Sequence, residues 1–172
     1  YPYFVRITGD CPLIHPPFID RQIEALIAYD ADLVRCDATS TLLEGQGACC
    51  TRSLRKVAQA FDHPDDQEHV GARYYAEHLK AFRAVGLRLP QHLKDTRWRL
   101  TVDEAKDYQM MATLYEALYQ GQPIPLEVAL DYLRRHPEVA GLNQQVEQSG
   151  INQELAKHRQ AQQPSLVGTL PW

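Results

Sequence analysis

The residues best suited to chemistry are two aspartates, Asp10 and Asp103. Asp10 follows a β-branched run that ends in Thr8, and Asp103 follows the run Leu100-Thr101-Val102. In a layered α/β fold, the carboxyl ends of the strands line the ligand crevice. Two carboxylates at neighbouring strand ends form a hard oxygen site for Mg²⁺, whose shell is completed by water and phosphate oxygens. The sequence therefore predicts that Asp10 and Asp103 are catalytic residues that share one Mg²⁺.

A second interpretation of the same spacing is that each aspartate only caps the helix that follows it, a common role for Asp. The strand before Asp10 offers further candidates for contacting a substrate. Side chains alternate along a strand, so Arg6, Thr8 and Asp10 share one face. A guanidinium suits oxyanions, and Arg6 and Thr8 are therefore predicted to bind substrate.

The elements that must position these residues alternate along the chain. Aromatic and β-branched runs predict strands at 3–8, 32–36, 48–51, 85–89 and 97–102. Helical spacing of apolar residues predicts helices at 16–27, 54–61, 66–82, 104–120 and 126–133. This order favours an α/β fold with three layers, in which helices cover both faces of a mostly parallel sheet.

Several details of these elements are also predicted. The long helix after Asp103 is expected to bury the face formed by Ala105, Tyr108, Ala112, Tyr115 and Leu118. Gly45 and Gly47 indicate a turn with unusual backbone angles. Domain organisation is expected to be one catalytic domain over residues 1–140, followed by a polar helical tail over 141–172 that ends in a short apolar segment.

Composition narrows the function. The chain has 172 residues and a formal net charge of −4, and it carries no basic stripe, which argues against binding to nucleic acid or to an anionic membrane. It contains no apolar run of the roughly 20 residues that a membrane-spanning helix needs. Its four cysteines form no CxxC pair, which favours reduced, partly buried thiols in a cytoplasmic protein.

Three motifs carry a resemblance to a known family. They are Val5-Arg6-Ile7-Thr8-Gly9-Asp10-Cys11-Pro12-Leu13-Ile14, Glu68-His69-Val70 and Arg99-Leu100-Thr101-Val102-Asp103. In this order, over about residues 3 to 120, they resemble the cytidylyltransferase family of spore-coat polysaccharide and acylneuraminate type. The first and third motifs are specific in combination, whereas the middle one is weak alone.

The resemblance implies a nucleotide-diphospho-sugar transferase fold in which Asp10 and Asp103 bind the metal. It implies a nucleotidyltransferase that transfers a cytidylyl group from CTP to a sugar or sugar acid for polysaccharide or glycoconjugate synthesis, and a homodimer. Glu68 and His69 would lie on the sugar side and contact substrate, although a histidine of this kind is more often a hydrogen-bonded structural group.

Departures from the family pattern are equally informative. The family opens with a strand and a Gly-rich, basic loop that wraps the triphosphate, and nothing before Tyr1 supplies it. We therefore expect the chain to be N-terminally truncated and inactive alone. His15 stands where the family usually has an acidic residue, and the stretch 45–51 lacks the acidic residue of the sugar-side strand, so the acceptor is expected to differ.

Two other functions stay open at this point, because a fold alone does not specify function. One is a glycosyltransferase that uses a ready-made nucleotide sugar and needs an Asp-x-Asp motif closing a strand. The chain has one such motif, Asp30-Ala31-Asp32, but it precedes a predicted strand and is interpreted as a helix-to-strand turn. The other is a non-catalytic interaction module, in which the aspartates are caps and the apolar C-terminus binds a partner.

Overall fold

A computed structural model gives the architecture of the chain and describes residues 1–38, 40–60, 70–95, 97–147 and 165–172. Its elements follow one another in this order: β1 (Tyr3–Ile7), α1 (Pro16–Tyr29), β2 (Leu33–Cys36), β3 (Gln46–Cys50), α2 (Thr51–Ala58), α4 (Ala72–Glu77), the 3-10 turn η1 (Leu79–Ala81), β4 (Ala84–Leu87), the 3-10 turn η2 (Gln91–Leu93), α5 (Ala105–Leu118), α6 (Leu126–Arg135), α7 (Pro137–Ala140) and β5 (Leu166–Leu170).

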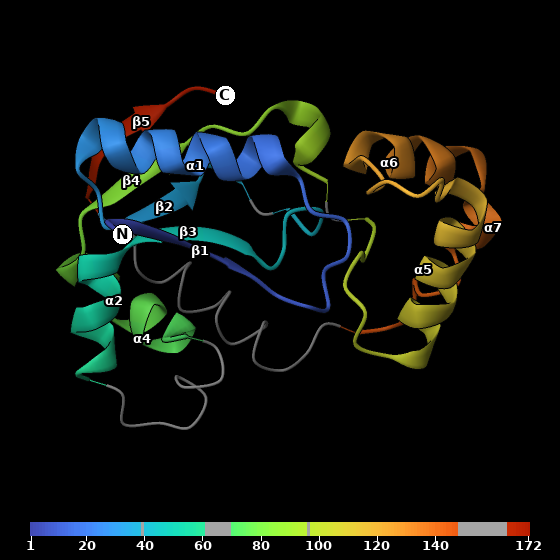
Figure 1. Ribbon diagram of the computed structural model, residues 1–172, viewed down its shortest axis with the longest axis horizontal. Coiled ribbons are helices and arrows are strands. Elements are labelled where there is room, and N and C mark those ends of the chain that lie inside the picture. Colours follow the sequence, from blue (N-terminus) through green and yellow to red (C-terminus); the bar gives the residue numbers. More distant parts are fainter. Residues whose placement is uncertain (39, 61–69, 96, 148–164) are drawn as a thin grey trace.

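The strands form one mixed sheet in the order β1-β3-β2-β4-β5. β3 runs antiparallel to both of its neighbours, whereas β2, β4 and β5 pair in parallel, so four of the five strands share one direction. Helix α1 covers one face of the sheet, and α2 and α4 cover the other (Figure 1). The predicted α/β fold with three layers and a mostly parallel sheet is therefore confirmed.

Side-chain alternation along the strands divides the core between the two faces. On β4, Ala84 packs with Leu33, Val57 and the η1 region, whereas Val85 packs with α1 residues such as Leu26. A third and larger cluster joins α5, α6 and α7 to the carboxyl end of β4. These three helices lie beyond the carboxyl ends of β1 and β2, where the predicted site should form (Figure 1).

Two predicted elements are wrong. Residues 97–102 form no strand, because the partner of this segment is the loop after β1 and not another strand, and Val102 N–H donates to the Asp10 carbonyl over 2.8 Å. The expected helix over 66–82 is also interrupted within its described part. Val70 and Gly71 adopt the left-handed backbone conformation, which an α-helix excludes, and α4 begins only after them.

The apolar C-terminal segment becomes part of the sheet. β5 pairs in parallel with β4 at the sheet edge. Beyond it, the Trp172 indole stacks on the His15 and Phe18 rings, with ring centroids 6.0 Å and 6.4 Å apart. This segment therefore packs along α1, although the predicted domain boundary at residue 140 stays a prediction. None of the described helices combines the length and the apolar character of a membrane-spanning segment.

Candidate functional site

The first side of the site is the loop that follows β1. Thr8 N–H donates to the Gly45 carbonyl over 3.0 Å, and Cys11 N–H donates to the Thr8 carbonyl over 3.2 Å, which closes a tight turn around Asp10. Asp10 itself is exposed to solvent. Partial burial alone would raise the pKa of Asp10, but hydrogen bonds from Thr8, the backbone and Cys11 outweigh that effect. The pKa of Asp10 therefore lies below its ordinary value. Asp10 is therefore an exposed, ionised carboxylate.

Gly45 is the residue that lets this turn close. Its φ of +68° lies in the left-handed region, and an added Cβ would stand 2.1 Å from Thr8 Oγ1 and 2.4 Å from Cys11 Sγ. Only glycine fits both demands. The unusual turn predicted from the two glycines is thus confirmed at Gly45, whereas Gly47 has no such backbone angle, and a Cβ added there would meet nothing within 4 Å.

The second side of the site is the segment that leads into α5. Thr101 Oγ1 donates to Asp103 Oδ2 over 3.0 Å, and the Arg99 guanidinium pairs with the same oxygen. The Asp103 side chain nevertheless keeps 38% of its surface exposed. Two donors therefore fix the orientation of this carboxylate while it still faces solvent.

The two sides meet through the hydrogen bond from Val102 N–H to the Asp10 carbonyl, 2.8 Å long. Tyr115 adds a second link, since its hydroxyl on α5 donates to the Pro12 carbonyl over 3.1 Å. These contacts bring the loops that carry Asp10 and Asp103 to the same edge of the molecule. That both carboxylates bind one cation stays a prediction.

The capping interpretation of the aspartates is wrong. The N-cap of α1 is His15, well after Asp10. The N-cap of α5 is Glu104, and its N–H donates to the Asp107 carboxylate over 3.0 Å in a capping box. Neither Asp10 nor Asp103 therefore has a capping role that accounts for its position.

A buried network behind Asp103 was missed by sequence reasoning. Asp107 is completely buried on α5 and accepts from Arg99 Nε over 3.0 Å and from Asn143 Nδ2 over 2.8 Å. Burial alone would raise the pKa of Asp107, but these hydrogen bonds, together with those from the Glu104 and Asp103 N–H groups, hold that pKa below its ordinary value. Asp107 is therefore an anion inside the domain.

The predicted apolar face of α5 is wrong at Ala105 and Tyr108, which are exposed, whereas Ala112, Tyr115 and Leu118 are partly buried, and the last two pack against the core. The buried face runs through Asp107, Met110, Met111 and Leu114. Their spacing is itself the helical signal for a buried face. Because this buried face begins with the acidic residue Asp107, its spacing was not interpreted as apolar. An acid in register with buried apolar residues is the sequence signal that could have indicated the network.

The remaining predicted site residues are not all described. Arg6 is half-buried on β1, and its neighbours Tyr3 and Val5 pack toward α1, so alternation directs Arg6 to the opposite face of the sheet. Thr8 Oγ1 lies 3.1 Å from Cys11 Sγ. The predicted substrate contacts Glu68 and His69 lie outside the described residues.

His15, the residue that departs from the family pattern, is buried. Its backbone N–H donates to Gln46 Oε1 over 2.7 Å, and its ring Nδ1 lies 3.5 Å from a carboxylate oxygen of Glu127 on α6. Burial lowers the pKa of His15, although Glu127 opposes that shift. His15 is therefore a neutral structural contact between the start of α1 and α6.

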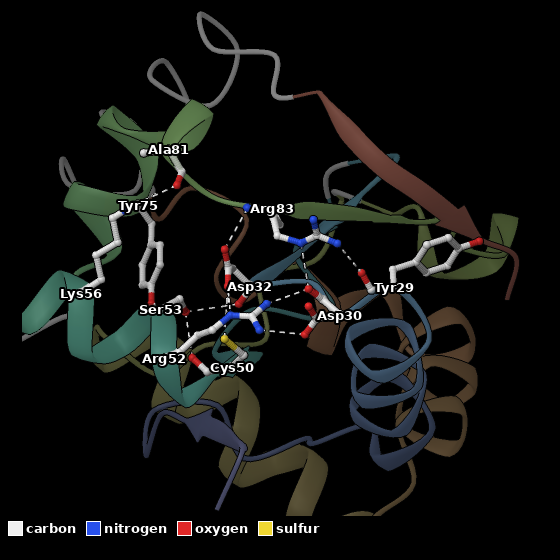
Figure 2. Close-up of polar contacts among 10 residues, drawn as sticks. All are labelled: Tyr29, Asp30, Asp32, Cys50, Arg52, Ser53, Lys56, Tyr75, Ala81 and Arg83. Atoms are coloured by element: carbon white, nitrogen blue, oxygen red, sulfur yellow. Dashed lines mark hydrogen bonds and ion pairs between the residues drawn. The ribbon is translucent and has the colours of Figure 1, made fainter.

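The Asp-x-Asp motif lies at the other end of the sheet, before β2, as the turn interpretation predicted. Figure 2 shows the Arg52 guanidinium between its two acids, with Nε 2.8 Å from Asp32 Oδ1 and a terminal nitrogen 2.7 Å from Asp30 Oδ1. Arg83 N–H donates to Asp32 Oδ2 over 2.9 Å. The motif therefore ties the end of α1 to α2 and to the residue before β4, through Asp30 Oδ1 and both carboxylate oxygens of Asp32.

A divalent cation fits the Asp10 and Asp103 edge by donor chemistry. The described residues contain no group of three or more His, Cys, Asp and Glu side chains that could hold a metal ion. Mg²⁺ commonly needs only one or two carboxylates, because water and phosphate supply the rest of its shell. Two solvent-facing aspartates on adjacent loops match that requirement.

Comparisons with known proteins place the chain among distant relatives. No protein-family model matches it. It is 28% identical over 151 residues to the uncharacterized protein MJ1063 of Methanocaldococcus jannaschii, which covers 87% of this chain and 60% of that protein. It is 26% identical over 141 residues to the spore coat polysaccharide biosynthesis protein SpsF of Bacillus subtilis, which covers 79% of this chain and 56% of that protein.

The fold has a close match among solved structures. A cytidylyltransferase from Leptospira borgpetersenii serovar Hardjo-bovis superposes with a TM-score of 0.70 at 20% sequence identity, over 86% of this chain and 61% of that one. The chain therefore spans about three-fifths of the length of the proteins that it matches.

Proposed function

We propose that this chain is the larger part of a nucleotidyltransferase that acts on CTP and a sugar or sugar acid. Its homology to SpsF and its cytidylyltransferase fold support the cytidylyltransferase family. The observation that carries the proposal is the junction of the loops bearing Asp10 and Asp103 through the 2.8 Å hydrogen bond from Val102 to Asp10. Exposed acidic residues at the edge beyond the strand ends are suited to a ligand that carries a metal and phosphates.

In the proposed reaction, a hydroxyl oxygen of the sugar attacks the α-phosphorus of CTP and loses its proton to solvent. The bond from that phosphorus to the bridging oxygen breaks, and pyrophosphate leaves. The protein contributes positioning and electrostatic stabilisation, as in other phosphoryl transfers. Arg6, on the strand that leads to Asp10, would offer a guanidinium to the phosphate oxygens.

Asp10 and Asp103 are the residues that would hold Mg²⁺, which would neutralise charge on the phosphate oxygens. Thr101 and Arg99 orient Asp103 by donating to one carboxylate oxygen, Oδ2. The hydrogen bonds that lower the pKa of Asp10 keep that carboxylate ionised at neutral pH. Both groups would therefore meet the cation as preorganised anions.

Two observations weigh against the alternative functions. The engagement of Asp30 and Asp32 by Arg52 removes the motif that a metal-dependent glycosyltransferase would use. The N-caps at His15 and Glu104 remove the structural role that a non-catalytic module would assign to Asp10 and Asp103.

The experiment that tests this function is a substrate screen on the protein in the full length that its gene encodes. Pyrophosphate release is measured with Mg²⁺, each of the four ribonucleoside triphosphates and a panel of neutral and acidic sugars. We expect release with CTP and one class of sugar. If a nucleotide sugar is consumed instead, with no pyrophosphate from any triphosphate, the glycosyltransferase alternative replaces this proposal.

A further inference from the structure

The carboxylate of Asp107 holds the backbone that presents Asp103. Its Oδ2 accepts from Asp103 N–H over 3.2 Å and from Glu104 N–H over 3.0 Å. Asn143, which is also buried, donates from Nδ2 to Asp107 Oδ1 over 2.8 Å and to the Arg99 carbonyl over 3.0 Å. The segment on either side of Asp103 is therefore fixed by two buried side chains from different parts of the chain.

Arg99 is shared between the two acids. Its Nε lies 3.1 Å and 3.0 Å from the two carboxylate oxygens of Asp107, and a terminal nitrogen pairs with Asp103. The Arg99 side chain is 9% exposed and that of Asp107 is 0% exposed, whereas Asp103 is 38% exposed. The buried acid thus pairs with the buried base, and the exposed acid is the member of the trio that reaches solvent.

Charge arithmetic gives this arrangement a consequence. Arg99, Asp103 and Asp107 together carry a net charge of −1. Without the charge of Asp107, the three side chains would have no net charge. Of the two carboxylates that pair with Arg99 in these contacts, only that of Asp103 would remain charged. A cation would then have to compete with the guanidinium for Asp103, because an opposite charge at close range is strongly attractive in a partly buried site.

We infer that Asp107 is a positioning residue for the proposed metal site: it neutralises Arg99 and, with Asn143, fixes the loop, so that Asp103 presents its charge to a divalent cation. The inference rests on the proposed function. Groups that orient a metal ligand without touching the metal commonly change metal affinity on the order of 10-fold to 100-fold when they are removed. Asp107 meets that description through hydrogen bonds to Arg99 and to the Asp103 backbone.

The test measures cation binding directly, with Mn²⁺ as the probe, by the loss of the free-ion electron paramagnetic resonance signal in a titration of the full-length protein. We expect Asp107→Asn to bind Mn²⁺ about tenfold more weakly than the parent protein. Asp131→Asn is the matched control, since Asp131 is an exposed acid on α6 that also pairs with an arginine. It should leave Mn²⁺ affinity unchanged.

A charge-restoring double variant separates positioning from simple stability. Combining Asp107→Asn with Arg99→Gln removes one negative and one positive charge, so the net charge around Asp103 returns to −1. We expect Mn²⁺ affinity to recover most of the loss, even though the melting temperature falls. If the double variant folds and binds no better than Asp107→Asn, the charge argument is overturned.

Further outcomes are equally decisive. Asp107→Asn with parental Mn²⁺ affinity overturns the inference. If Asp107→Asn does not fold, Asn143→Ser carries the test, because it leaves every charge in place and removes the amide group that bonds to Asp107 and to the Arg99 carbonyl. Parental affinity in that variant also overturns the inference. Asp103→Asn in the same titration distinguishes the two proposals: unchanged Mn²⁺ binding there removes the metal site itself, whereas loss there with no effect at Asp107 removes only the positioning role.

Discussion

Gly45 offers a quantitative test of how the Asp10 turn is built. In Gly45→Ala, the new Cβ would lie 2.1 Å from Thr8 Oγ1 and 2.4 Å from Cys11 Sγ, at a φ of +68°. The left-handed conformation costs roughly 1 to 2 kcal/mol for a residue with a Cβ. Overpacking in a closed site adds about 1 to 3 kcal/mol. The free energy of unfolding should therefore fall by roughly 2 to 5 kcal/mol.

The assay is equilibrium urea unfolding, and the chain provides its own control. Gly47→Ala is a substitution two positions away, with no atom within 4 Å of its Cβ and no left-handed backbone. It should be neutral or slightly stabilising, because glycine weakens a strand. Equal stability of the two variants, to within about 0.5 kcal/mol, would refute the reasoning, since surface substitutions without special features fall in that range.

Three other predictions address the rest of the fold. Arg52→Ala should lower the free energy of unfolding by about 1 kcal/mol, a small value because the ion pairs are partly exposed, whereas Arg55→Ala on the same helix should have no effect in the same urea assay. Burial lowers the pKa of His15 below its ordinary value of 6.5. The stability that the neutral ring contributes is therefore present above pH 6.5 and is lost as the pH falls below 6.5, where the unfolded chain takes up a proton first. The melting temperature should therefore fall less steeply between pH 7 and 5.5 in His15→Gln than in the parent protein. Burial raises the pKa of Cys11 to about 12 and that of Cys49 to about 11, so neither thiol should react with iodoacetate at pH 8 in the folded protein. Mass spectrometry measures the carboxymethylation, and rapid modification of either thiol would contradict the prediction.

Local patterns predicted much of the fold. The alternation of strand-like and helix-like apolar runs was sufficient to predict the layered sheet, because strands and helices with one buried face repeat their apolar residues at different periods. The four cysteines form no disulfide with one another, as the absence of paired spacing indicated. The turn at Gly45 was also predictable, since glycine is the residue that tolerates a left-handed backbone.

What could not be predicted depended on partners distant in sequence. Residues 97–102 have strand-like composition, but their neighbour in space is the loop at Asp10, and a strand needs another strand to pair with. Asp107 interrupts the apolar face of α5, and its burial becomes favourable only because Arg99 and Asn143 lie beside it. No local pattern in the sequence places Asn143 against Asp107.

The aspartate pair lies between these two cases. The motif types and their place after apolar runs indicated both residues, and the structure removes the capping explanation for each. The sequence predicts that both aspartates follow adjacent strands, whereas in the structure Asp10 follows β1 and Asp103 follows a loop. Asp103 still reaches the same edge as Asp10, because Val102 N–H donates a hydrogen bond to the Asp10 carbonyl, as a residue of a neighbouring strand would.

The most direct test of the account is the turnover of Asp103→Asn in the full-length protein, measured as pyrophosphate release with CTP, Mg²⁺ and the sugar that the screen identifies. Glu104→Gln is the control, because it neutralises the adjacent N-cap residue and leaves Asp103 intact. We predict a loss on the order of a hundredfold or more for Asp103→Asn, comparable to removing one preorganised electrostatic group, with nearly parental turnover in the control. An Asp103→Asn protein that melts like the parent and keeps nearly full turnover would contradict the account.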